Sequence, residues 1–303
     1  MALNTAAAGA LEPCEREVPI ALPGEVLVRV RACGLCGKDL LLLDGELAPI
    51  DVPLVPGHEI VGVVEVVGDG VSRLKVGDRV GVPWLGYACG ACDYCTSGRE
   101  NLCRSARFTG VHVDGGCSDY VVADADYTFA LPEGYTDAEL APLLCAGVTG
   151  YRAYRMIGRA QRIGLYGDGP AADLIAKIAA HEQREAHLVA PGNAPSARLD
   201  AAIVLASDGR LVADALSNLV PGGVVVCAVP VRDIFSIAYS QLADERMIRS
   251  VTNITRDDVR ELLALASAVP LKTRVQTYAL ADANRAIGDL RADRVQGAAV
   301  LTP

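Results

Sequence analysis

The sequence lacks a basic N-terminal leader, an apolar run long enough to span a membrane and an excess of positive charge. Its 303 residues carry a net charge of −9, which argues against nucleic-acid and anionic-membrane partners, because these select basic surfaces. Only three phenylalanines accompany thirty glycines, and about half of the residues are apolar, as in a folded α/β protein. We therefore expect a cytoplasmic protein with two domains, whose ten cysteines stay reduced and are mostly available to metals.

Four of the cysteines, Cys89, Cys92, Cys95 and Cys103, lie in one short polar segment. Three cysteines at intervals of three residues and a fourth across a loop can supply the tetrahedral four-sulfur shell of one Zn²⁺. Two disulfides would need an oxidising compartment, and scattered structural thiols rarely have this spacing. The segment predicts a structural zinc lobe over residues 89–103, in which the metal supplies order that a core cannot.

This lobe resembles the structural zinc lobe of the zinc-dependent alcohol dehydrogenases of the medium-chain dehydrogenase/reductase superfamily. The resemblance covers nearly the whole chain and is strongest up to Thr149. It implies a small-molecule substrate and a homodimer or homotetramer. It also implies a GroES-like β-rich catalytic domain (1–149), a Rossmann-like domain (150–275) and a C-terminal return to the catalytic domain (276–303).

Short runs of alternating apolar and polar residues predict the β-rich domain independently of the resemblance. Strands are expected over 25–31, 60–68 and 78–83, and a glycine turn at 114–116 precedes a further strand. Many short strands at regular intervals indicate a barrel-like antiparallel fold.

The resemblance also implies a second, catalytic zinc, making two zinc ions per chain. Carried over residue by residue, Cys36, His58 and Cys145 would bind Zn²⁺ and leave a fourth position open to water or substrate. Glu59 would lie beside the metal as an occasional alternative ligand, and Asp39 would orient the ligating histidine. The alternative is a metal-free relic of such a site. Four other cysteines match no ligand position and are expected to be small buried apolar residues: Cys14, Cys33, Cys117 and Cys227.

Two positions near this zinc depart from the family's pattern. Lys38 stands where the family has a Ser or Thr that passes on the alcohol proton, and Leu41 stands where many members carry a relay histidine. Lys38 could take over as a general base, because a nearby Zn²⁺ favours the neutral amine. Alternatively, Lys38 points away and pairs with Asp39 or Glu59.

The second half has the pattern of a dinucleotide-binding fold. A glycine-rich turn containing Gly167, Gly169 and Ala172 follows a strand over 162–166 and opens a helix over 170–181, which is the expected context for cofactor binding. Strands are also expected over 185–190, 200–206 and 222–228, with a helix over 211–219. Near the C-terminus, a helix over 281–290 and a strand over 297–302 are expected.

Parts of that fold are missing, so the Rossmann-like domain is predicted to be truncated. The interval Pro191–Leu199 is too short for a third strand and its helices, because one parallel crossover takes about a dozen residues or more. Asp168 puts a carboxylate in the phosphate turn, and Pro170 removes a backbone N–H from it. Ala190 stands where an acidic residue would bind the ribose. Whether the chain binds NAD(P) is therefore left open, because its cofactor site departs at all these points from a complete dinucleotide-binding fold and has the pattern of a site that has lost part of its function.

Three functions are compatible with these observations. The preferred interpretation is redox-neutral Lewis-acid chemistry by the Cys/His/Cys zinc, such as elimination, addition, isomerisation or cyclisation, with Lys38 as acid or base. The alternative is an NAD(P)-dependent zinc alcohol dehydrogenase or carbonyl reductase. A non-enzymatic relic that keeps zinc for folding is the third.

Overall fold

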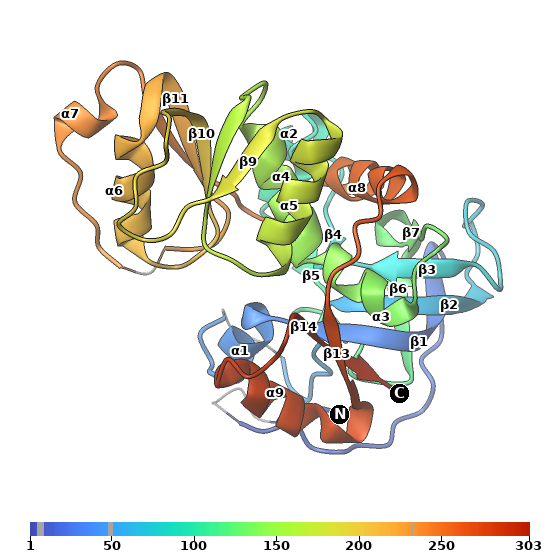
Figure 1. The fold of residues 1–303 in the computed structure, drawn as a ribbon. Helices are drawn as coiled ribbons and strands as arrows, with labels where there is room; N and C mark the ends of the chain where they lie inside the picture. The colour runs from blue at the N-terminus through green and yellow to red at the C-terminus, as the bar shows by residue number, and fades with distance from the viewer. Residues whose placement is uncertain (5–8, 48–50, 232) are drawn as a thin grey trace. The chain divides into compact units, whose positions relative to one another are not determined.

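A computed structural model describes residues 1–4, 9–47, 51–231 and 233–303 (Figure 1). The chain forms two compact units, and each is described by itself. The first contains residues 1–146, 253–267 and 272–303, and the second contains residues 147–252 and 268–271.

The first unit is built on a seven-stranded sheet with the order β13-β14-β1-β2-β3-β7, in which β6 also pairs with β1. The long strand β1 pairs in antiparallel fashion with β2, β6 and β14. The sheet is mixed, because β13 and β14 run parallel, whereas an antiparallel fold was expected. The strands are β1 (Glu25–Leu35), β2 (Glu59–Val67), β3 (Arg79–Val82), β6 (Tyr120–Asp124), β7 (Phe129–Ala130), β13 (Val275–Ala279) and β14 (Ala298–Thr302), with β4 (Leu85–Tyr87) and β5 (Arg107–Phe108) forming a separate pair.

Short helices connect these strands. The C-terminal helix α9 lies beside α1, and Arg291 on α9 forms an ion pair with Asp44 at 2.7 Å (Figure 1). Together with the pairing of β14 and β1, this contact returns the end of the chain to the first unit. The helices are α1 (Gly37–Leu43), α2 (Asp93–Thr96), α3 (Asp137–Leu140), α8 (Arg256–Ala268) and α9 (Ala283–Arg291), with 3₁₀ turns η1 (Glu100–Leu102), η2 (Ala125–Tyr127), η3 (Ala141–Leu144) and η4 (Leu280–Asp282).

The second unit is a five-stranded parallel sheet with the order β12-β11-β10-β8-β9. A complete doubly wound sheet has the order 3-2-1-4-5-6, so β9 occupies the position of its second strand and ends the sheet. No helix or strand is formed between β9 and β10, all of whose connecting residues the structure describes, which confirms the predicted loss of the third strand. The strands are β8 (Arg162–Tyr166), β9 (Glu185–Leu188), β10 (Leu199–Val204), β11 (Leu219–Cys227) and β12 (Met247–Ser250).

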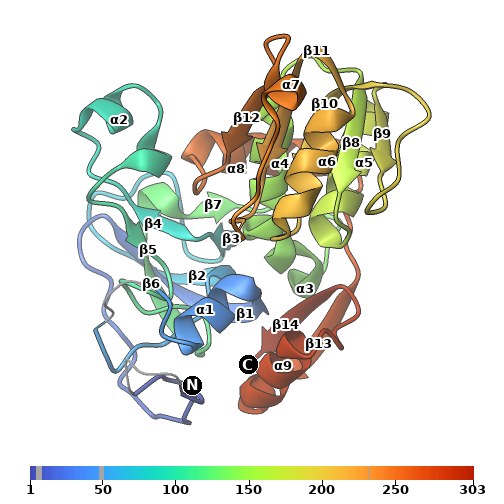
Figure 2. The ribbon, with the colours of Figure 1, turned by 90° about the vertical axis from the view of Figure 1, so that its left-hand side faces the viewer.

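Helices pack against this sheet through apolar faces. Helix α6 (Gly209–Ser217) buries Leu211, Val212, Ala215 and Leu216 against residues of β10 and β11 (Figure 2). Helix α5 (Pro170–His181) has the predicted bounds and buries a stripe that contains Leu174, Ile175 and Ile178. Helix α4 (Ala146–Met156) approaches α5 closely at Gly150, and α7 (Tyr239–Leu242) is a single turn.

Most of α8 belongs to the first unit, whereas the expected domain ranges place it in the second. Two hydrogen bonds join α8 to other parts of the first unit: the Tyr135 hydroxyl donates to the Ala266 carbonyl at 2.8 Å, and the Arg256 backbone N–H donates to Glu100 at 2.9 Å.

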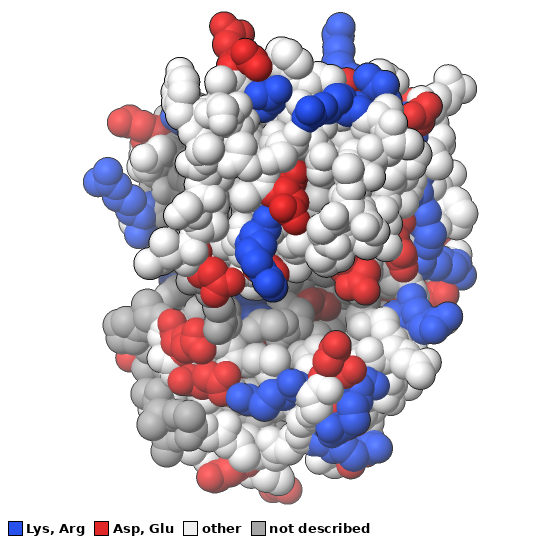
Figure 3. Space-filling view, turned by 60° about the vertical axis from the view of Figure 1, so that its left-hand side comes forward, with Lys and Arg blue, Asp and Glu red and all other residues white. Residues whose placement is uncertain are grey.

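Within the described residues, no helix is both long and apolar enough to cross a membrane. Acidic and basic side chains are interspersed on the face shown in Figure 3.

We expect Leu174→Ala to lower the free energy of unfolding of the second unit by about 2–5 kcal/mol, because the substitution leaves a cavity where the side chain is 1 % exposed. Urea unfolding followed by circular dichroism measures this loss. Lys177→Ala on the exposed face of α5 is the control and should change stability by less than about 0.5 kcal/mol. Equal losses in both variants would contradict the packing described for α5.

Candidate functional site: two cysteine-containing metal centres

The pairing of β1 with β2 brings the first two predicted ligands together. In the antiparallel register, Gly34 near the end of β1 lies opposite Glu59 at the start of β2. Cys36 follows the end of β1 and His58 precedes the start of β2, so both lie at the same end of this pair of strands. Cys145 reaches the same place from the end of η3, which packs against β1, β2 and β3.

The three side chains have the spacing of a tetrahedral zinc site. The sulfurs of Cys36 and Cys145 are 3.8 Å apart, and Nε2 of His58 lies 3.4 Å from the first and 3.3 Å from the second. Zinc bonds of about 2.3 Å to sulfur and about 2.0–2.1 Å to nitrogen place ligand atoms about 3.6–3.8 Å apart. The residues therefore fit Zn²⁺, and three of them leave one tetrahedral position open.

Asp39 contacts two of these residues and fixes their positions. One carboxylate oxygen accepts the backbone N–H of Cys36 at 2.8 Å, closing the capping box of α1, and the other lies 3.3 Å from Nδ1 of His58. Burial disfavours a charged imidazole, but the Asp39 carboxylate and the Cys145 sulfur outweigh burial and raise the pKa of His58 to about 10.

Lys38 points toward the thiols. Its Nζ lies 3.5 Å from the Cys145 sulfur and 4.6 Å from the centre of the Trp84 ring. No ion pair joins Lys38 to Asp39 or Glu59, all three of which the structure describes, so the arrangement in which Lys38 points away is not the one observed. Burial opposes the ammonium charge, but the fields of Cys145 and Cys36 prevail and raise the pKa of Lys38 above its ordinary value.

Glu59 lies within the same group, with a carboxylate oxygen no more than 4.8 Å from the other ligand atoms. The side chain is buried, and it occupies the space that a Cβ on Gly34 would need, since that atom would come within 2.0 Å of Oε2. Burial, with a contribution from Cys145, raises the pKa of Glu59 well above its ordinary value. A glycine at position 34 thus makes room for a carboxyl group beside the metal position.

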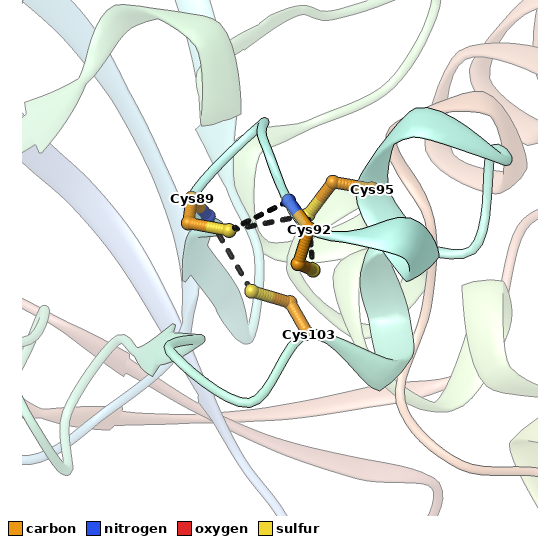
Figure 4. Close-up of side chains that lie close together, drawn as sticks. All are labelled: Cys89, Cys92, Cys95 and Cys103. Atoms are coloured by element: carbon orange, nitrogen blue, oxygen red, sulfur yellow. Dashed lines mark hydrogen bonds between the residues drawn. The ribbon is translucent and has the colours of Figure 1, made fainter.

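The predicted zinc lobe forms a second cluster. The sulfurs of Cys89, Cys92, Cys95 and Cys103 converge from a loop, α2 and the end of η1 and lie within 4.8 Å of one another (Figure 4). Backbone N–H groups of Ala91 and Cys92 point at the Cys89 sulfur and lower the pKa of this thiol to about 6. Four converging sulfurs of which one readily ionises suit a structural Zn²⁺.

The predicted cofactor turn lies between β8 and α5. Gly167 and Gly169 have φ values of 110° and 99°, a region that favours glycine, and Ala172 is buried in the first turn of α5. The backbone N–H groups of Ala171 and Ala172 lie in the first turn of α5, where an anion can accept hydrogen bonds from them. Asp168 is exposed in this turn, and Ala190 is exposed beyond the end of β9.

Sequence reasoning missed Trp84, which is the chain's only tryptophan. Its ring lies edge-on to the His58 ring at 4.8 Å and stacks on Phe108 at 5.0 Å. The strand predicted over 78–83 just before it was the available signal, but only the folded chain places the indole beside the histidine.

The prediction for the remaining cysteines is wrong at one position. Cys14 is exposed, because it lies in an irregular segment, whereas Cys33, Cys117 and Cys227 are buried as expected.

Comparisons with known proteins agree with this fold. Residues 22–133 match the alcohol dehydrogenase GroES-like domain. The chain is 40 % identical to a probable alcohol dehydrogenase, AdhA, of Mycobacterium tuberculosis (97 % of this chain, 93 % of the relative), and 36 % identical to an alcohol dehydrogenase of Geobacillus stearothermophilus (96 % of each). The structure resembles a cinnamyl alcohol dehydrogenase (SbCAD4) of Sorghum bicolor, with a TM-score of 0.85 at 27 % identity (99 % of this chain, 96 % of that chain).

These similarities extend over both units of the chain. The alignment with the mycobacterial relative runs over 321 positions against 303 residues here, so that relative has residues that this chain lacks. The identity and the coverage together assign the family: the chain belongs to the zinc-dependent alcohol dehydrogenases of the medium-chain dehydrogenase/reductase superfamily.

Proposed function

We propose that this protein is an NAD(P)-dependent zinc alcohol dehydrogenase or carbonyl reductase acting on a small molecule. The observation that carries this proposal is the convergence of Cys36, His58 and Cys145 at zinc-ligand spacing with one position left over. Relatives that align over nearly the whole chain are named alcohol dehydrogenases, which supports oxidoreduction over the redox-neutral chemistry preferred from the sequence. A cytoplasmic location and a homodimer or homotetramer stay predictions.

Zinc held by these three residues would polarise the oxygen of a carbonyl or an alcohol. Asp39 orients the imidazole of His58 through Nδ1 and holds the Cys36 backbone in place. Glu59, buried beside the ligands, would be available as an alternative carboxylate ligand to this zinc. Cys89, Cys92, Cys95 and Cys103 would hold the structural zinc.

Lys38 supplies a positive charge beside the reacting oxygen. Its ammonium is 3.5 Å from the Cys145 sulfur, and the family's hydroxyl relay is absent because Lys38 and Leu41 occupy those positions. A cation at this point stabilises a developing alkoxide or donates a proton to it.

A nicotinamide dinucleotide would supply or accept the hydride. The backbone at Gly167, Gly169 and Ala172 would bind its pyrophosphate, because the turn keeps the positive φ angles and a helix N-terminus follows. Without a third strand beyond β9, this chain would hold the adenosine end by fewer contacts.

Redox-neutral zinc chemistry is the second candidate, and one observation favours it. The absence of an element between β9 and β10 removes part of the wall that a doubly wound sheet offers a dinucleotide. The three-ligand site would serve a lyase or isomerase as well as a dehydrogenase.

Calorimetric titration with NADH and NADPH separates the two candidates. We expect saturable one-site binding by one of them in about the micromolar range, followed by turnover of alcohols or aldehydes. Gly169→Ala should weaken this binding about tenfold, because a Cβ at φ 99° strains the phosphate turn. Gly222→Ala is the matched control, since it also has a positive φ and open space around its Cβ. No binding by either nucleotide would reject the dehydrogenase.

Metal analysis tests the two centres. We expect about two zinc ions per chain in the purified protein and about one in Cys36→Ala, because that variant loses a ligand of the catalytic centre only. Cys95→Ala should also retain about one, held by the other centre. If Cys36→Ala keeps two zinc ions, then the assignment of its centre is wrong.

Replacement of Lys38 tests its charge. Lys38→Met keeps an unbranched side chain of similar length without the charge and should lower kcat/KM about a hundredfold, the order expected for losing one stabilising donor. Lys38→Arg should restore much of the lost kcat/KM if the positive charge of this side chain stabilises the reacting oxygen. Loss of activity in both variants would instead identify Lys38 as a residue that transfers a proton, because arginine does not deprotonate.

A further inference from the structure

The indole of Trp84 forms part of the candidate catalytic centre, and its contacts hold it in one orientation. Its ring meets His58 edge-on at 4.8 Å and lies under Nζ of Lys38 at 4.6 Å. A cation over an indole is attracted to the ring face, so the position of the ring sets the position of the ammonium. Whatever holds Trp84 therefore also holds Lys38 and His58.

Asn253 holds the polar edge of this indole. Its Oδ1 accepts the Trp84 Nε1–H at 3.1 Å, and its Nδ2 donates to the Asn101 carbonyl at 3.1 Å. Only one orientation of the amide allows both bonds, because an indole nitrogen can only donate and a carbonyl can only accept. Asn253 has a φ of 52°, a conformation that asparagine tolerates better than most residues.

The other end of this bridge is the four-cysteine lobe. Asn101 lies in η1, which ends just before Cys103. Glu100 of the same turn accepts from the Arg256 backbone at 2.9 Å and from its side chain at 3.3 Å. The segment at Asn253–Arg256 is thus fixed to the lobe by hydrogen bonds at two points, all within the first unit.

We propose that Asn253 is a positioning residue, which sets the Trp84 indole against His58 and Lys38 and transmits the order of the four-cysteine lobe to the candidate catalytic centre. The lobe then contributes to the catalytic centre as well as to folding. The inference concerns the same site as the proposed function. Its readout is tryptophan fluorescence, which needs no activity, so the two can fail separately.

The side-chain test compares two variants at position 253 in the zinc-loaded protein. Asn253→Gly suits the positive φ and removes both bonds, so we expect a red shift of Trp84 emission and increased acrylamide quenching. Asn253→Asp keeps an acceptor for the indole but loses the donor to the Asn101 carbonyl, so we expect a smaller red shift than in Asn253→Gly. Because Trp84 is the only tryptophan, the signal has one source.

Asn284→Ala is the matched control. Asn284 also uses both ends of its amide, accepting the Leu11 N–H at 2.9 Å and donating to the Leu11 carbonyl at 2.8 Å. It should leave emission unchanged. Unchanged emission in Asn253→Gly, or an equal shift in Asn284→Ala, would overturn the proposal.

Coupling to the lobe is tested with Cys92→Ser, which removes one sulfur of that cluster. We expect a red shift that is not enlarged by adding Asn253→Gly. In the Asn253→Asp background, where the link to Asn101 is already lost, Cys92→Ser should add no further shift. If Cys92→Ser does not fold, then Glu100→Gln weakens the same anchor and replaces it. Additive shifts in the double variant would refute transmission through Asn253.

Discussion

The antiparallel register of β1 and β2 is the constraint on which the candidate catalytic centre depends. It sets Gly34 opposite Glu59, and Cys36 and His58 are the residues that continue from these two strand ends. A slip of one residue would turn the side chains to the other face and separate the sulfur from the imidazole. The buried alternation of Val26, Val28 and Val30 opposes such a slip, so the core of the sheet also fixes the metal geometry.

Charge balance is the second requirement of this centre. Asp39, Glu59 and Lys38 surround three ligand side chains in a buried space, and an isolated charge there would be costly. Asp39 is compensated by His58 and by the Cys36 backbone, and Lys38 by the sulfurs and the Trp84 ring. The sulfurs and the indole face thus provide contacts for the Lys38 ammonium.

The second unit shows how a sheet can lose a strand and remain folded. The missing strand would lie beyond β9, at an edge, so its loss leaves the pairing of β8, β10 and β11 intact. The cost is an uncovered edge, where Leu188 is 64 % exposed. Loss of a central strand would instead have opened the core that α6 covers. The turn at Gly167 and Gly169 follows β8, a strand that pairs with β9 and β10 on its two sides, so it does not depend on the missing edge strand.

The family resemblance supplied Cys36, His58 and Cys145 as one predicted ligand set. The sequence alone predicted the four-cysteine set, the bounds of α5, four of the five strands of the reduced sheet and the missing third strand, but not β12. Each of these follows from local spacing, periodicity or chain length, which are properties of neighbouring residues. Only the tertiary structure decided which way Lys38 points, that Trp84 lies beside His58, that most of α8 joins the first unit and that Asn253 bridges Trp84 to the lobe. These contacts join residues far apart in the chain, so the packing of several elements fixes them and no local pattern encodes them.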